Sequence, residues 1–171
     1  MNKDYKSEEE FLKDYDSTSF EKLSVTADIL IFSVSNEEEN NYRKTDKKKM
    51  SILLVKRRNY PFKDKWCLPG GFLQIDENLD DAPKRILKKE TNIDDIYLEQ
   101  LYTFGNIDRD PRMRIISTSY MALVDKSRLA NNLSADSSWF DIVLREDKDD
   151  MVTIVLDNGN ESINFSIKKL L

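Results

Sequence analysis

The sequence has no histidine among its 171 residues and only one cysteine, Cys67. The absence of histidine excludes Ser-His-Asp and Cys-His nucleophilic catalysis, HExxH zinc sites and histidine general bases. A Cys/His zinc site is excluded as well, and one cysteine cannot form an internal disulfide. Any catalysis therefore depends on carboxylates, lysine, arginine, tyrosine or a hard metal ion bound by oxygen.

Long apolar runs are also missing, because no stretch approaches the ~20 apolar residues that a spanning helix needs. Glu8, Glu9 and Glu10 lie where a secretory signal would be apolar. A single cysteine suits a reducing compartment, so we expect a cytoplasmic protein without a membrane partner. The net charge of 27 − 32 = −5 gives no reason to expect a broad nucleic-acid-binding surface.

The order of apolar and polar segments predicts one domain with two extensions. We expect a charged arm over residues 1–22, a domain over 23–145, and a C-terminal hairpin with the start of a helix over 146–171. Residues 35–49 are typical of a solvated hairpin loop. Alternating and β-rich segments predict strands over residues 25–34, 51–55, 66–68, 96–104, 114–124, 139–143, 151–156 and 162–165. Residues 165–171 resemble a helix that begins and then stops, so we expect a further segment after Leu171.

The richest pattern begins at Gly71 and ends at Ile93. Five residues separate Gly71 from Glu77, and seven more separate Glu77 from Arg85. We expect a helix from an Asn78 cap to about Thr91, with Pro83 costing one hydrogen bond in its first turn.

This spacing resembles the Nudix box, G-x5-E-x7-R-E-U-x-E-E-x-G-U, where U is aliphatic. The positions that match are Gly71, Glu77, Arg85, Leu87, Glu90 and Ile93, preceded by Leu68-Pro69-Gly70-Gly71. The departures are Ile86 and Lys89 in place of two glutamates, and Asn92 in place of a glycine.

Residues 98–112 (LEQLYTFGNIDRDPR) resemble the Nudix branch that handles ADP-ribose. That branch includes pyrophosphatases and Nudix-related transcriptional regulators, in which a winged-helix domain follows the Nudix domain. The resemblance implies an α/β fold, the Nudix α/β/α sandwich with a mixed sheet and the loop-helix module. It also implies an ADP-ribose-like nucleotide as ligand, a homodimer, and contact with nucleic acid only through a further C-terminal domain.

The departures matter because diphosphate hydrolysis needs hard cations such as Mg²⁺ or Mn²⁺. Positions 86, 89 and 90 are spaced i, i+3 and i+4 and share one helix face. Only Glu90 offers a carboxylate there, so we expect the metal to be weakly held if at all. Replacing Ile86 and Lys89 by glutamate is then expected to improve metal binding.

The resemblance assigns roles to the matching positions. Glu90 is expected as the metal ligand and, with Glu77, as a catalytic residue. Glu77 and Arg85 are expected to form the salt bridge that ties the loop to the helix. The expected substrate-binding residues are Arg57, Arg58, Gly70, Gly71, Arg85, Lys89, Arg109 and Arg112. Carboxylates that could replace the lost ligands are Asp76, Asp80, Asp108 and Asp110.

Five further side chains are expected in the core rather than against a nucleotide: Phe62, Trp66, Cys67, Tyr102 and Phe104. Three functions stay open at this level. The chain is a Mg²⁺-dependent pyrophosphohydrolase of weakened or lost activity, a non-catalytic nucleotide sensor of a transcriptional regulator, or an interaction module without ligand.

Overall fold

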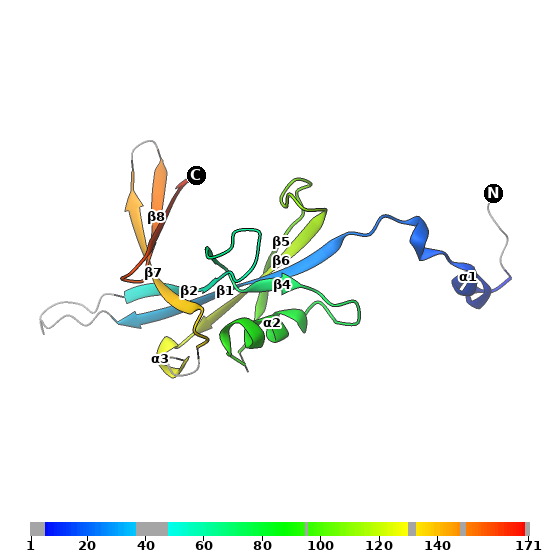
Figure 1. Cartoon of the computed structure of the whole chain (residues 1–171), viewed down its shortest axis with the longest axis horizontal. Helices are drawn as coiled ribbons and strands as arrows, with labels where there is room; N and C mark the ends of the chain where they lie inside the picture. The colour runs from blue at the N-terminus through cyan, green and yellow to red at the C-terminus, as the bar shows by residue number, and fades with distance from the viewer. Residues whose placement is uncertain (1–5, 37–47, 95, 130–132, 148–149, 170–171) are drawn as a thin grey trace, which may run out of the picture.

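The computed structural model describes residues 6–36, 48–94, 96–129, 133–147 and 150–169. Figure 1 shows one twisted sheet with short helices beside it. The helix α1 (Glu8–Asp14) lies apart from that sheet (Figure 1) and buries none of its side chains. No helix within the described ranges is long and apolar enough to cross a membrane.

The sheet is mixed, as the sequence resemblance predicts. Its order is β5-β6-β1-β2-β7-β8-β9, with β3 paired to β2 and β4 paired to β1. Strand β1 runs parallel to β6 and antiparallel to β2 and β4. The strands are β1 (Ser24–Asn36), β2 (Lys48–Lys56), β3 (Trp66–Cys67), β4 (Gly70–Phe72), β5 (Glu99–Phe104), β6 (Ile115–Val124), β7 (Ser137–Glu146), β8 (Met151–Asp157) and β9 (Ser162–Lys168).

The central strand β1 separates two hydrophobic clusters by simple alternation. Its buried residues Ala27, Ile29 and Ile31 pack against the helix α2 (Ala82–Thr91). The partly buried Leu129 of α3 (Lys126–Leu129) joins the same cluster. The residues between them in β1 point to the opposite face, where Thr26 and Asp28 line a cavity.

The second cluster lies where β2, β7, β8 and β9 meet. Phe140 is fully buried there, and the ring of Trp66 packs edge-on against it at 5.0 Å between centroids. The predicted core position of Trp66 is therefore confirmed. The ends of the hairpin β8–β9 contribute Leu156 and Ile163.

The box helix begins later than the sequence suggests. Asp81 takes the N-cap position, and Asn78 instead donates a side-chain hydrogen bond to Asp81 at 3.1 Å. The prediction of an Asn78 cap is wrong, because three more residues form a turn before the helix. Pro83 then lies in the first helical turn. A backbone N–H at that position has no intrahelical acceptor, so the missing N–H of proline costs no hydrogen bond. Asn92 ends the helix in the left-handed conformation, with φ 63°, a place that the family pattern gives to glycine.

The predicted helix at the C-terminal end is also wrong. Residues 162–168 form β9, which pairs along its whole length with β8. The Asn158-Gly159 turn joins the two strands of the predicted hairpin, with Gly159 at φ 84°. Pairing with β8 therefore overrides the helical pattern of SIKKLL. The predicted loop over residues 35–49 lies mostly outside the described residues, although β1 and β2 pair as expected for a hairpin.

Candidate functional site

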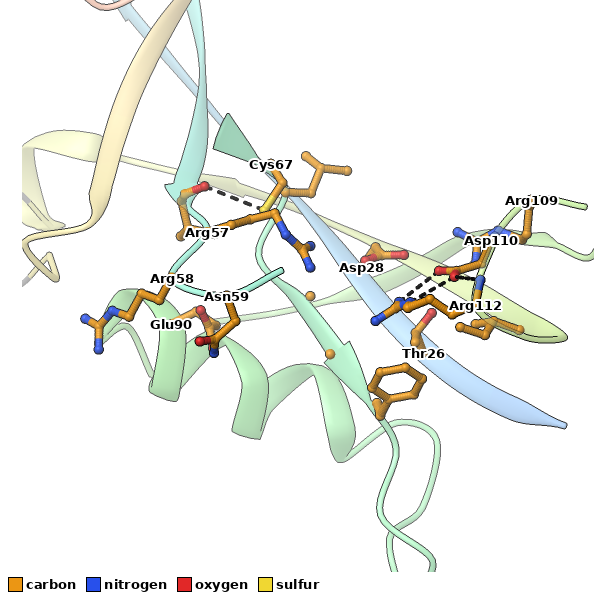
Figure 2. Close-up of a pocket in the computed structure, with 16 residues that line it drawn as sticks. Thr26, Asp28, Arg57, Arg58, Asn59, Cys67, Glu90, Arg109, Asp110 and Arg112 are labelled. Carbon is orange, nitrogen blue, oxygen red and sulfur yellow. Dashed lines mark hydrogen bonds and ion pairs between the residues drawn. The ribbon is translucent and has the colours of Figure 1, made fainter. Parts of the chain in front are cut away.

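A cavity of about 530 Å³ opens between β1, β4, the end of β2, the end of α2 and the turn after β5 (Figure 2). Its charged lining has a small excess of positive charge, since four arginines outnumber three carboxylates. The charged residues are Arg57, Arg58, Arg109, Arg112, Asp28, Glu90 and Asp110. Gly70 and Gly71 form part of the wall, so six of the eight predicted substrate-binding residues come together here.

Arg57 and Arg58 follow β2 but point in different directions (Figure 2). Arg57 Nε donates to the carbonyl of Pro61 at 2.7 Å, which leaves the other guanidinium nitrogens directed into the cavity. Arg58 instead pairs with the carboxylate of Asp136, and its side chain is 76% exposed. A phosphate in the cavity would therefore meet Arg57 first.

The turn after β5 supplies Arg109, Asp110 and Arg112. The Arg112 guanidinium donates to both carboxylate oxygens of Asp110 at 2.8 and 2.9 Å, and these bonds hold the pKa of Asp110 well below its ordinary value. The same guanidinium lies 5.5 Å from the ring centre of Phe72 in β4. The ion pair and the ring thus fix Arg112 at the cavity wall.

Asp28 is a site residue that the sequence analysis does not identify. It lies in the middle of β1, and Ser117 of β6 donates a hydrogen bond to its Oδ2. The signal that could reveal it is a charged residue within the apolar run VTADILIFSV. A charged side chain is rarely buried in a strand unless it has a polar partner or a function. Its carboxylate is half-buried in the cavity, between the arginines (Figure 2).

Gly70 makes room for this carboxylate. A Cβ at position 70 would lie 2.2 Å from Asp28 Oδ1 and 3.2 Å from the carbonyl oxygen of Ala27, whereas a Cβ at Gly71 would meet only Ile86 at 3.4 Å. We therefore expect Gly70→Ala to lower the free energy of unfolding by about 1–3 kcal/mol, as overpacking does. Gly71→Ala is the matched control and should cost less than 1 kcal/mol in urea unfolding. Equal losses in the two variants would show that Asp28 does not limit this position.

Glu77 and Arg85 form the predicted salt bridge. Arg85 donates to the two carboxylate oxygens of Glu77 at 2.6 and 2.7 Å and to the carbonyl of Phe72 at 3.0 Å. The pair thereby ties the loop after β4 to the helix. Neither side chain lines the cavity, so the catalytic role of Glu77 and the substrate contact of Arg85 stay predictions.

The salt bridge makes stability depend on pH. The hydrogen bonds from Arg85 lower the pKa of Glu77 from its ordinary value of 4.5. A lowered pKa adds stability above 4.5 that is lost as pH falls through the folded-state value. We expect the unfolding free energy of the wild type to fall more steeply than that of Glu77→Gln below pH 4.5. Parallel pH profiles of the two proteins in urea titrations would contradict this.

The box helix brings only Glu90 to the cavity. Ile86 is 2% exposed and packs in the α2 cluster, and the side chain of Lys89 is 75% exposed. Lys89 Nζ lies 3.9 Å from Glu90 Oε1 but does not line the cavity. In the parts of the chain that the structure describes, no three carboxylate or cysteine side chains form a metal-binding group. The donors within those described parts thus do not fit a cluster of two or three metal ions.

The other candidates divide between the cavity and the surface. Of the four replacement carboxylates, only Asp110 lines the cavity, and Asp80 instead accepts a hydrogen bond from Tyr120 at 2.9 Å.

Cys67 is half-buried and lines the cavity, where burial raises the pKa of its thiol. Phe62, Tyr102 and Phe104 are 68%, 61% and 49% exposed, so their predicted core positions are wrong. A turn and an edge strand leave these rings uncovered.

The fold and the cavity together define the class of this protein. The NUDIX domain family matches residues 41–156. The chain belongs to the Nudix family, and hydrolases of this family generally use Mg²⁺ or Mn²⁺.

Two curated relatives indicate the branch. The chain is 38% identical over 139 residues to the ADPR responsive transcriptional repressor NtrR of Acinetobacter baylyi, covering 79% of this chain and 51% of the relative. It is 36% identical over 92 residues to an ADP-ribose pyrophosphatase of Methanocaldococcus jannaschii, covering 53% and 54%. The chain thus spans about half the length of the curated relatives it matches.

Solved structures agree with this assignment. The NUDIX domain of Shewanella oneidensis NrtR complexed with ADP ribose matches with a TM-score of 0.61 and 32% identity, over 78% of this chain and 82% of that one. A MutT/nudix family protein from Enterococcus faecalis matches with a TM-score of 0.69 and 26% identity, over 96% and 63%. The α/β fold with a mixed sheet and few helices is therefore confirmed.

Proposed function

We propose that this Nudix domain binds ADP-ribose or a similar nucleoside diphosphate in the arginine-lined cavity. The observation that carries the proposal is the orientation of Arg57 and Arg112, which point into the cavity from opposite sides (Figure 2). Two fixed guanidinium groups can bind the oxygens of a diphosphate without help from a metal. The relatives named for ADP-ribose support the nucleotide class.

We propose further that hydrolysis is weak or lost and that Mg²⁺ or Mn²⁺ is held weakly. Glu90 is the one carboxylate that the described box helix brings to the cavity, because Ile86 lies in the core and Lys89 faces solvent. A Mg²⁺ ion held by one carboxylate would keep most of its waters and would take its other oxygen ligands from the phosphates of the bound nucleotide. This arrangement favours a sensor domain over an efficient enzyme.

A pyrophosphohydrolase is the second candidate. Two features favour it: the Glu77–Arg85 salt bridge keeps the loop and helix of the box in place, and Asp28 adds a carboxylate to the cavity. When a metal ion is bound, it would polarise the phosphates and activate a water. Glu90 is then the residue whose loss must stop turnover.

One paired experiment separates the two candidates. Calorimetry measures the binding of ADP-ribose without metal, and AMP release is followed with excess Mg²⁺ or Mn²⁺. Binding without AMP release supports the sensor, whereas AMP release that Glu90→Gln abolishes supports the enzyme. The absence of both binding and release would refute the nucleotide proposal and favour an interaction module.

We also propose a cytoplasmic homodimer. The relative named a transcriptional repressor supports a role in the control of transcription, whereas the homodimer rests on the sequence resemblance. For this protein we propose contact with DNA only through a domain outside the Nudix fold, because the net charge of −5 provides no broad basic surface. The mass of the purified protein in solution tests the dimer.

A further inference from the structure

We infer that Tyr102 and Phe104 of β5 form a platform on which the base of the bound nucleotide stacks. This inference rests on the proposed function and extends it from the phosphates to the base. The two rings contact one another at 4.9 Å between centroids, with 69° between their planes. They are 61% and 49% exposed, which leaves ring surface free for a planar ligand.

The strand register places the aromatic pair on the same sheet face as the cavity. Tyr102 lies opposite Ser119, and Ser119 lies opposite Asp28. Phe104 lies opposite Ser117, whose hydroxyl donates to Asp28 across the same face. Side chains at directly paired positions point to the same side of a sheet. The platform and the Asp28 carboxylate therefore lie on one sheet face, with the two rings beside the cavity rather than among the residues that line it.

The spacing suits a nucleotide. Strand β6 separates β5 from β1, and neighbouring strands lie about 4.8 Å apart, so Tyr102 and Asp28 are on the order of 10 Å apart. A ribose and one phosphate bridge that distance. The intervening β6 side chains on this face, Ser117 and Ser119, are small and buried. The turn that carries Arg109 and Arg112 continues directly from Phe104.

The chemistry of the two neighbouring surfaces is complementary. The guanidinium groups offer charge to the phosphates, whereas the rings offer an apolar face without charge. Purine bases stack on aromatic side chains, and loss of such a ring weakens binding by about tenfold or more. Because stacking requires no specific hydrogen bond, the platform selects for a base without defining which one.

The test compares two ligands in calorimetry without metal: ADP-ribose, and inorganic pyrophosphate, which lacks a base. The double variant Tyr102→Ala/Phe104→Ala should bind ADP-ribose about tenfold or more weakly and bind pyrophosphate as the wild type does. Thr103→Ala is the matched control, since Thr103 lies opposite Thr118 on the other sheet face. It should leave both affinities within about twofold.

Three outcomes would overturn the inference while leaving the nucleotide proposal intact. The first is a double variant with unchanged ADP-ribose affinity, and the second is an equal loss of affinity for both ligands. The third is a double variant with a different mass in solution, because the rings would then form a contact between copies of the chain. Failure of the wild type to bind ADP-ribose would overturn the proposed function and the inference together. Thermal unfolding of each variant distinguishes a local effect from a loss of fold.

Discussion

Ile86→Glu is expected to destabilise the domain by about 3–5 kcal/mol, the cost of leaving an unpaired charge in a core. The side chain of Ile86 is 2% exposed and lies among Ala27, Ile29 and Leu53. A carboxylate there would lie among apolar side chains. The denaturation midpoint in urea measures the loss.

This result would replace the expectation that a glutamate at position 86 restores a metal ligand. Lys89→Glu is the matched control, because its side chain is 75% exposed and the change should stay within about 0.5 kcal/mol. An Ile86→Glu variant that keeps its stability and binds Mg²⁺ more tightly would show that position 86 reaches the cavity. The structure favours destabilisation instead, because the Ile86 side chain packs in the core next to Gly71, where a Cβ at position 71 would lie 3.4 Å from it.

Arg57→Ala is expected to weaken ADP-ribose binding by about 10- to 100-fold. A hydrogen bond to a charged group contributes about 1.5–3 kcal/mol, which corresponds to such a factor. Pro61 fixes the Arg57 guanidinium through a hydrogen bond of 2.7 Å, so little side-chain freedom is lost on binding. Calorimetry without metal gives the affinity directly.

Arg58→Ala is the natural control for Arg57. Arg58 carries the same charge one residue later, but Asp136 holds its guanidinium away from the cavity centre. We expect its removal to change the affinity by less than about threefold. A larger effect for Arg58 than for Arg57 would mean that the phosphates lie nearer the rim than the geometry indicates.

Much of the fold follows from local patterns. The strands β1, β2, β6 and β8 lie within a few residues of their predicted ranges, because β-rich alternation needs no distant partner to be recognised. The Glu77–Arg85 contact is likewise predicted and confirmed, since both residues belong to one loop-helix module. Errors arise where pairing overrides local preference, as in β9, or where a turn delays a helix, as before Ala82.

The sequence by itself determined the Nudix module, the loss of two box glutamates and the exclusion of histidine and zinc chemistry. The tertiary structure decided which side chains meet. Asp28 and Ser117 are 89 residues apart and touch only because β1 and β6 pair in parallel. Ile86 points into the core and Tyr102 out of it because strand register and helix rotation fix the direction of each side chain. These relations depend on contacts between distant segments, which local sequence patterns do not encode.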